Sequence, residues 1–273
     1  DVKSGLALGH RRLSVVDLSS SGNQPITSEC SRYVLTYNGE IYNHLELRDE
    51  LNRATGEISW RGRSDTETLL QALKYWGIKD CLPRLNGMFA FAIWDSQENI
   101  LYLARDRMGE KPLYYGSLGM GSKKSFVFAS QLKALCAHPQ FNNEISQTAL
   151  ATYLRFSNVP SPLSIYEGIF KIPPGCLLKV TNPNDTEFVI EKWWSLKDLI
   201  IGRDGNLILE DKQAIGKLDL VLEKAVSKQL LGDVPIGAFL SGGIDSSLIA
   251  AYMQKQSLRP IKTFTVGFAE SSF

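Results

Sequence analysis

The most constraining feature of this sequence is a seven-residue loop, SerGlyGlyIleAspSerSer, at residues 241–247. A short apolar run at residues 236–240 precedes the loop, and residues 246–256 have helical spacing with apolar side chains on one side. A second short apolar run follows at residues 261–266. A strand, a helix and a strand in this order need a crossover connection, which places the two strands parallel in one sheet. The C-terminal part of the chain is therefore predicted to be an α/β unit.

The loop has the composition of an anion site. Gly242 and Gly243 let the backbone approach a ligand with its N–H groups turned inward, and the following helix adds the positive end of its dipole. The loop lacks the GlyLysSer or GlyLysThr of a Walker loop and the third glycine of a dinucleotide fingerprint. Asp245 would repel phosphates unless a cation bridged them, so we expect Mg²⁺ there. The alternative is a simple glycine turn with Ser246 as a helix cap.

The N-terminal part has a different pattern. Residues 88–94 are apolar throughout, as in a strand that is covered on both faces. Together these elements predict two packed sheets with helices outside, an αββα arrangement of the α+β class. Strands are expected at 33–38, 88–94, 100–104, 126–129, 176–180 and 188–194, and helices at 45–54, 65–76, 148–155 and, beyond a charged and glycine-containing stretch, 212–231.

Charge and cysteine usage argue against several classes of partner. The 30 Lys and Arg residues nearly balance the 29 Asp and Glu residues, so no basic excess suggests nucleic acid or a membrane surface as a partner. The four cysteines and three histidines are scattered, without the spacing of a zinc site or a disulfide framework. We therefore expect reduced thiols and a cytoplasmic protein.

Four strings in the N-terminal part occur in the order of one known family. They are GlyHisArgArgLeuSerValValAsp (9–17), TyrAsnGlyGluIleTyrAsn (37–43), SerAspThrGlu (64–67) and AspArgMetGlyGluLysProLeuTyrTyr (106–115). These strings resemble the class II glutamine amidotransferase domain, which has an N-terminal-nucleophile hydrolase fold, in the form found in asparagine synthetases. The loop at 241–247, with GlyAlaPheLeu before it and PheThrValGlyPhe after it, resembles the PP-loop of ATP pyrophosphatases of the asparagine synthetase branch.

The resemblance implies a domain plan. Residues 1–198 would form the glutaminase domain with αββα layers, residues 199–211 a linker, and residues 212–273 the start of a parallel-sheet ATP pyrophosphatase domain. The substrates would be glutamine, aspartate and ATP, with Mg²⁺ as the metal, and the plan is compatible with a homodimer. Residues 106–115 would form a turn beside the substrate pocket and take no part in the chemistry.

The resemblance also assigns the glutamine site. Arg12 would hold the α-carboxylate, Asp65 and Glu40 would hold the ammonium end, and Leu13, Ser14, Val15 and Val16 would line the site. The Asn38 side-chain amide and the Gly39 backbone N–H would form the oxyanion hole for the attacked amide. Taken singly, each residue has a simpler reading: Arg12 in a surface ion pair, Asn38-Gly39 as a hairpin turn, and Asp65 as a helix cap.

In the second domain the resemblance assigns an ATP site. Leu240 and Val266 would flank the adenine ring. The phosphates would lie on Ser241, Gly242, Gly243, Ser246 and Ser247, with Asp245 holding Mg²⁺ together with pyrophosphate.

This sequence departs from the family pattern at its start. The family nucleophile is an N-terminal cysteine, whereas residue 1 is Asp, and an internal cysteine has no free α-amine to act as base. We therefore expect the nucleophile upstream of Asp1, the synthetase domain to continue past Phe273, and the chain by itself to be inactive. Two alternatives stay open: an amidotransferase with another acceptor, and a non-catalytic truncated product. A glucosamine-phosphate synthase or a purine amidotransferase would share only the first domain, and the 241–247 loop argues against both.

Overall fold

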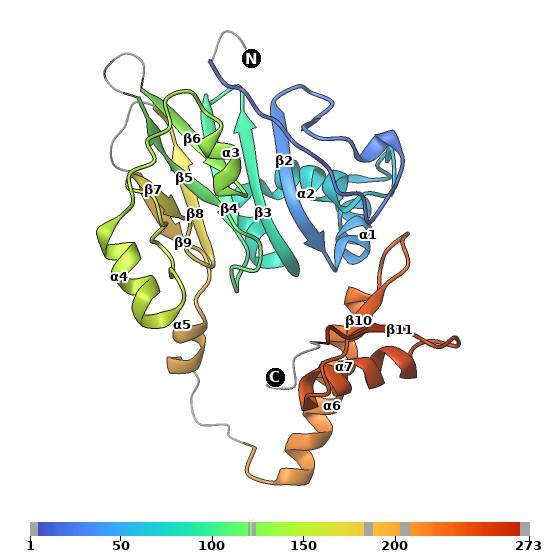
Figure 1. Ribbon diagram of the computed structural model, residues 1–273. Coiled ribbons are helices and arrows are strands. Elements are labelled where there is room, and N and C mark those ends of the chain that lie inside the picture. The colour runs from blue at the N-terminus through green and yellow to red at the C-terminus, as the bar shows by residue number, and fades with distance from the viewer. Residues whose placement is uncertain (1–4, 120, 122–123, 183–187, 203–207, 268–273) are drawn as a thin grey trace. The chain divides into compact units, whose positions relative to one another are not determined.

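The computed structural model of the protein describes residues 5–119, 121, 124–182, 188–202 and 208–267 (Figure 1). Its internal contacts divide the chain into two compact units. The first comprises residues 1–12 and 19–202, and the second comprises residues 13–18 and 203–273. Within the described ranges, no helix is both long and apolar enough to cross a bilayer. The short segment 13–18 thus groups with the C-terminal part of the chain, although it lies near the start of the sequence.

A six-stranded antiparallel sheet forms the centre of the first unit (Figure 1). The expected strands at 33–38, 88–94, 100–104, 176–180 and 188–194 all lie in it. Its longest pair, β2 (Tyr33–Ile41) and β3 (Gly87–Asp95), runs in unbroken register from Tyr33 opposite Asp95 to Ile41 opposite Gly87. The strand order is β1 (Ile26–Thr27), β2 (Tyr33–Ile41), β3 (Gly87–Asp95), β4 (Ile100–Arg105), β8 (Cys176–Val180) and β9 (Val189–Lys192).

A smaller antiparallel sheet contributes to the inner core of this unit. Its order is β6 (Ser125–Ala129), β5 (Tyr114–Leu118) and β7 (Ile169–Lys171). Leu113 and Tyr115 from its β5 region share a buried cluster with Ala92 and Leu103 of the large sheet. This cluster therefore fills the space between the two sheets.

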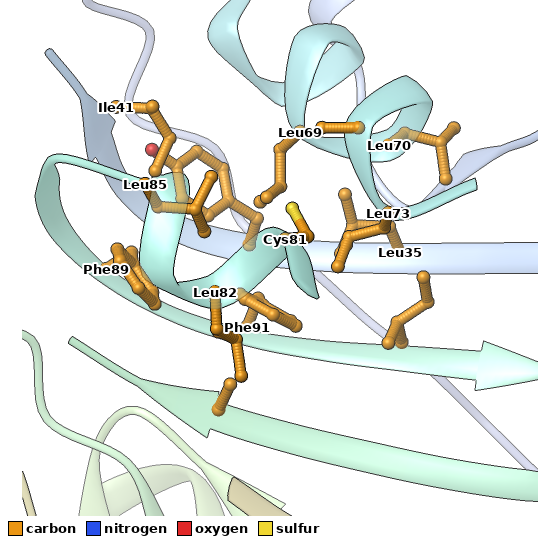
Figure 2. Close-up of a cluster of buried hydrophobic side chains, with 14 of the residues drawn as sticks. Leu35, Ile41, Leu69, Leu70, Leu73, Cys81, Leu82, Leu85, Phe89 and Phe91 are labelled. Atoms are coloured by element: carbon orange, nitrogen blue, oxygen red, sulfur yellow. The ribbon is translucent and has the colours of Figure 1, made fainter. Parts of the chain in front are cut away.

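Helices cover the outer faces of both sheets. Helices α1 (His44–Thr55) and α2 (Asp65–Cys81) pack on the large sheet around Leu51, Leu69 and Phe91, as Figure 2 shows in part. The short helix α3 (Leu132–Cys136) shares a third cluster with the small sheet. The layer order is helix, sheet, sheet, helix, which confirms the predicted αββα arrangement.

Alternation along β3 explains why its whole length is apolar. Phe89, Phe91 and Ile93 face the helices, whereas Ala90 and Ala92 face the small sheet. Successive side chains on a strand point to opposite faces, so a strand between two cores needs apolar residues at every position. The expectation that residues 88–94 are covered on both faces is confirmed.

Two elements of the first unit differ from expectation because of glycine. Helix α2 continues past the predicted end at residue 76 to Cys81, through a kink at Gly77 with φ 74°. Strand β5 was not expected, since Gly116 interrupts its pattern. A Cβ at Gly116 would lie 2.5 Å from the carbonyl oxygen of Gly168, which shows a close backbone approach.

The remaining helices of the first unit and its short turns complete the chain trace. Helix α5 (Leu196–Ile201) crosses residue 198, where the sequence predicted the first domain to end, and the first unit ends at residue 202. Residues 203–207 of the expected linker lie outside the described residues. These elements are α4 (Gln147–Phe156), α5 (Leu196–Ile201) and two 3₁₀ turns, η1 (Ser20–Gly22) and η2 (Leu82–Arg84).

The second unit contains the expected strand, helix and strand. Strands β10 (Gly237–Phe239) and β11 (Lys262–Phe264) are parallel, with α7 (Ile244–Lys255) between them in sequence. Helix α6 (Asp211–Gln229) packs on α7 through a small core that includes Val226 and Tyr252. The predicted apolar stripe of this helix is only partly buried, because Ile215 and Leu218 are exposed.

Asp106, at the end of β4, organises the turn that follows it. Its carboxylate accepts four backbone N–H groups: Oδ1 from Met108 (3.1 Å) and Glu110 (2.9 Å), and Oδ2 from Lys111 (2.9 Å) and Phe89 (3.2 Å). The side chain is fully buried. Asp106, the first residue of the 106–115 string, thus holds the turn that follows it and also binds Phe89 of β3.

Replacing Asp106 by Ala is expected to lower the free energy of unfolding by about 3 kcal/mol, because four backbone N–H groups, including that of buried Phe89, lose their charged acceptor. Urea unfolding measures the change. Asp80→Ala is the control, since Asp80 is exposed at the end of α2, and it should change stability by no more than about 0.5 kcal/mol. A loss below about 1 kcal/mol at Asp106 would contradict this structural role.

Candidate functional site

The predicted oxyanion residues lie inside a strand. Asn38 pairs with Ala90 and Gly39 pairs with Phe89, well within β2, so the hairpin-turn reading of this dipeptide is wrong. A Cβ on Gly39 would stand 2.1 Å from the carbonyl oxygen of Met88. A Cβ on Gly87, on the partner strand, would stand 2.0 Å from the carbonyl oxygen of Glu40. Two glycines therefore permit a close approach of β2 and β3 at this end of the pair.

The hydrogen bonds of Phe89 indicate where the Gly39 N–H points. Phe89 donates its N–H to Asp106 and accepts the N–H of Asp106 at 2.8 Å, so its backbone groups face β4. In an antiparallel pair, residues whose groups face away from each other form a non-hydrogen-bonded pair. Gly39, opposite Phe89, therefore directs its N–H away from β3 and toward the other edge of β2.

The neighbouring N–H groups on this edge already have partners. Tyr37 donates its N–H to Oε1 of Gln24 at 2.6 Å, and Ile41 donates its N–H to Oδ2 of Asp65 at 3.0 Å. Strand β1 covers β2 only at Val34 and Leu35. The Gly39 N–H lies between these two bonded groups on an edge that β1 does not cover, which suits a donor to a bound carbonyl oxygen.

Asp65 is the first residue of α2, but it is not the helix cap. Ser64 is the cap, because its Oγ accepts the N–H of Thr66 at 3.1 Å. The carboxylate of Asp65 instead reaches β2, where Oδ2 accepts the Tyr37 hydroxyl at 2.7 Å as well as the Ile41 N–H. The cap reading of Asp65 is therefore wrong, and the structure brings Asp65 to the same stretch of β2 as Gly39.

The other acidic residue of the SerAspThrGlu string holds the loop before α2. Glu67 is buried and accepts the N–H groups of Arg61 at 2.9 Å and of Gly62 at 3.0 Å. Arg48 adds a hydrogen bond to the Ser64 carbonyl at 2.9 Å. Within this string Ser64 caps α2, Asp65 contacts β2, and Glu67 holds the preceding loop. The residues around Asp65 therefore hold it in position.

Asn38 and Glu40 point to the opposite face of β2 from Tyr37. The Asn38 amide lies 3.4 Å from the hydroxyl of Ser130, the residue that follows β6. Burial raises the pKa of Glu40, and the negative charge of Asp65 raises it further, while Lys111 acts in the other direction. The end of β2 therefore presents the Asn38 amide and the Glu40 carboxylate on one face, and Glu40 interacts electrostatically with Asp65.

Arg12 lies in the first unit with a half-buried side chain. Its guanidinium donates to the Ser19 carbonyl at 3.0 Å and packs against Gly22, where a Cβ would stand 2.1 Å from Nη2. Its role as the carboxylate ligand stays a prediction.

The four residues after Arg12 group with the second unit. Leu13, Ser14, Val15 and Val16 belong to the 13–18 segment, and the Val15 carbonyl accepts the Asp233 N–H at 3.0 Å. Their assignment to the glutamine site likewise stays a prediction. Sequence reasoning did not single out Tyr37, Gln24 or Ser64, although Tyr37 and Ser64 stand in the quoted strings.

The 241–247 loop of the second unit joins β10 to α7. Gly242 has φ 82°, a conformation that favours glycine, and Gly243 caps α7 without a side chain of its own. The Ser246 hydroxyl donates to the Gly243 carbonyl at 3.2 Å and lies 3.1 Å from the Ser241 hydroxyl. The loop is therefore closed by its own serines around an exposed helix N-terminus.

The remaining residues of the predicted ATP site lie around this loop. Asp245 is exposed in the first turn of α7, and Ser247 donates its N–H to Gly243 at 3.1 Å. Leu240 donates its N–H to Phe264 at 2.8 Å, and its carbonyl accepts the Thr265 hydroxyl at 2.6 Å. Val266 is exposed just after β11. Leu240 and Val266 thus follow neighbouring parallel strands, where ligands of open α/β sheets commonly bind.

Comparison with known proteins gives matches for both units. Residues 2–194 match the model of the glutamine amidotransferase domain, and residues 217–273 match that of asparagine synthase. The chain is 36% identical over 270 residues to asparagine synthetase [glutamine-hydrolyzing] 3 of Bacillus subtilis, covering 96% of the chain and 41% of that protein. A putative asparagine synthetase [glutamine-hydrolyzing] 2 of Methanocaldococcus jannaschii is 34% identical, covering 96% of the chain and 51% of that protein. Amidase chyE of Penicillium rubens is 32% identical, covering 98% of the chain and 39% of that protein. The chain thus spans about two fifths to one half of the length of these relatives.

Replacing Gly39 by Ala should destabilise the first unit by about 2 kcal/mol or more, since the new methyl group would overlap the Met88 carbonyl. Thermal and urea unfolding measure the effect. Gly9→Ala is the matched control in the same unit, because a Cβ there meets no atom within 4 Å. Equal stabilities of the two variants would show that β2 and β3 can separate at no cost.

Proposed function

Since this chain belongs to the glutamine amidotransferase domain family, we propose that its first unit is the glutamine site of a glutamine-dependent asparagine synthetase. The observation that carries the proposal is the end of β2, where the Gly39 N–H faces an edge that β1 does not cover and Asp65 lies two residues along the same edge. The Gly39 N–H suits the amide oxygen of glutamine, and the buried Asp65 carboxylate suits the ammonium of the same molecule.

In this proposal each polar group of glutamine has a partner of opposite character. The ammonium lies at the carboxylates of Asp65 and Glu40, and the α-carboxylate lies at the Arg12 guanidinium. The amide carbonyl lies between the Asn38 side chain and the Gly39 N–H, which stabilise the negative charge on oxygen when the carbon is attacked. The attacking group is the N-terminal cysteine of the longer protein, as the family resemblance implies. Collapse of the tetrahedral intermediate breaks the carbon–nitrogen bond, so the amide nitrogen leaves as ammonia and a thioester remains. Water then hydrolyses the thioester to glutamate and the free thiol.

The second unit is proposed to begin the ATP site of the same enzyme. The N–H groups of the 241–247 loop and of the α7 N-terminus suit phosphate oxygens. Aspartate and ATP would give β-aspartyl-AMP and pyrophosphate, and ammonia would displace AMP to give asparagine. Asp245 fits a Mg²⁺ ion, since its exposed carboxylate belongs to the loop itself and Mg²⁺ uses one or two carboxylates together with phosphate oxygens. The metal would neutralise phosphate charge there.

An acceptor other than aspartate is the second candidate. It is favoured by the similarity to a protein named amidase chyE, whose name does not refer to asparagine. A non-catalytic truncated product remains the third alternative. The cytoplasmic location and the homodimer expected from the sequence stay predictions.

The deciding experiment uses the full-length protein that carries this chain. Glutamate release from glutamine and pyrophosphate release from ATP are measured with and without aspartate. The proposal expects both activities, with pyrophosphate release dependent on aspartate. Glutamate release without any aspartate-dependent pyrophosphate release would favour another acceptor, and the absence of both activities would favour the non-catalytic product.

Asn38→Ala in the full-length protein should reduce kcat for glutamine hydrolysis by about 10²-fold with a smaller change in KM, because it removes an oxyanion donor. Asn142→Ala is the control, as Asn142 is exposed and lies outside the site. Steady-state glutaminase kinetics give both constants. An unchanged kcat for Asn38→Ala would remove this residue from the oxyanion hole.

The pH dependence of glutamine binding should follow Glu40. Its pKa lies above the ordinary value of 4.5, mainly because of burial. The ionised carboxylate attracts the ammonium, so affinity should be full above this raised pKa and should fall as pH drops through it. Calorimetric titrations with glutamine from about pH 4 to 8 span this range. Glu40→Gln should lose this transition, and a transition that persists in Glu40→Gln would assign the titration to another group.

A further inference from the structure

The buried hydroxyl of Tyr37 makes a specific contact that packing alone does not require. Tyr37 is 3% exposed, and its ring packs in the core between the large sheet and α1 and α2. The hydroxyl donates to Oδ2 of Asp65 at 2.7 Å, which is a short, charge-assisted distance. A phenylalanine would fill the same core, so the hydroxyl needs a separate explanation.

Both hydrogen bonds to Asp65 fall on the same oxygen. Oδ2 accepts the Tyr37 hydroxyl and the Ile41 N–H, at 2.7 and 3.0 Å. Across the described ranges, no hydrogen bond or ion pair to Oδ1 is found. A carboxylate oxygen offers about two lone-pair sites, so Oδ2 is filled while Oδ1 keeps its full capacity to accept.

This division fixes the orientation of the carboxylate. Rotation about the terminal side-chain bond of aspartate is soft, so an unrestrained carboxylate could present either oxygen. Two donors from β2 on one oxygen hold the group in a single rotation, and the N-terminus of α2 stabilises its negative charge. Burial and the charge of Asp65 raise the pKa of Tyr37 well above its ordinary value, so its hydroxyl keeps its proton.

We propose that Tyr37 is a positioning residue that turns Oδ1 of Asp65 toward the α-ammonium of glutamine and thereby selects amides that carry this ammonium. The inference rests on the proposed glutamine site and adds a residue to it. Tyr37 and Gly39 lie on the same strand, two residues apart, so one strand would set both the ammonium position and the oxyanion donor. The distance between the two ends of the substrate would then be set by β2 itself.

The test compares two ligands that differ only in the ammonium. L-Glutamine and glutaramate, its analogue without the α-amine, are titrated by calorimetry into the 273-residue protein and its variants. The variants are Tyr37→Phe and, as a matched control, Tyr115→Phe. Tyr115 is also a buried tyrosine, and no hydrogen bond of its hydroxyl is found in the described part of the chain.

The expected result is a selective loss. Tyr37→Phe should weaken glutamine binding by about tenfold, the effect of losing one hydrogen bond to a charged group, and should change glutaramate binding by less than about twofold. Tyr115→Phe should leave both affinities within about twofold of wild type. A purely structural role for Tyr37 would weaken both ligands equally, so equal losses, or no loss of glutamine binding, overturn the inference.

Failure of the proposed function gives a different result. A wild-type protein that binds no glutamine overturns the glutamine site and the inference with it, whereas a wild type that binds glutamine leaves the Tyr37 comparison to decide. Should Tyr37→Phe fail to fold, a crystal structure of the wild type with glutamine is decisive. A substrate ammonium bound to Oδ1 of Asp65, with the Tyr37 hydroxyl still bonded to Oδ2, supports the inference. An ammonium bound to any other group overturns it.

Discussion

The carboxylate of Asp106 accepts four backbone N–H groups, and the geometry of the candidate glutamine site depends on this clasp. The carboxylate accepts the Phe89 N–H, and the Asp106 N–H donates to the Phe89 carbonyl, so both backbone groups of Phe89 face β4. Because hydrogen-bonding direction alternates along a strand, the opposite residue, Gly39, directs its own N–H away from β3. A buried residue outside the site thus helps to hold the strand register that orients the proposed oxyanion donor.

The same alternation places the side chains of β2 on two different faces of the sheet. Odd-numbered residues of β2, such as Tyr37, face α1 and α2, while Asn38 and Glu40 face the opposite side. Asp65 reaches the strand edge from the start of α2, and its charge raises the pKa of Glu40. The negative charge of Asp65 disfavours the ionised form of Glu40, and Lys111 only acts against this effect, so a cationic group such as an ammonium suits the pair of carboxylates. In the proposed function, that ligand is the amino end of glutamine.

Sequence reasoning was strongest where pattern and period agree. The strand at 88–94 and the order of strand, helix and strand at 236–266 were predicted because hydrophobic period depends on local chain geometry. It failed at Gly77 and Gly116, where glycine marks a kink or a close approach that depends on distant backbone. The Asn38-Gly39 dipeptide carries a turn signal on its own, and pairing with β3 overrides that signal.

By itself the sequence determined the αββα class of the first unit, the α/β start of the second, and the residue types of both candidate sites. These follow from period, from glycine placement and from strings that occur in a family's order. Tertiary structure alone decided that Asp65 bonds to β2, and that the Tyr37 hydroxyl and the Ile41 N–H fill one of its two carboxylate oxygens. The reason is physical: which groups a carboxylate meets depends on the packing of a helix against a strand more than 20 residues away in sequence, and no local pattern records that packing.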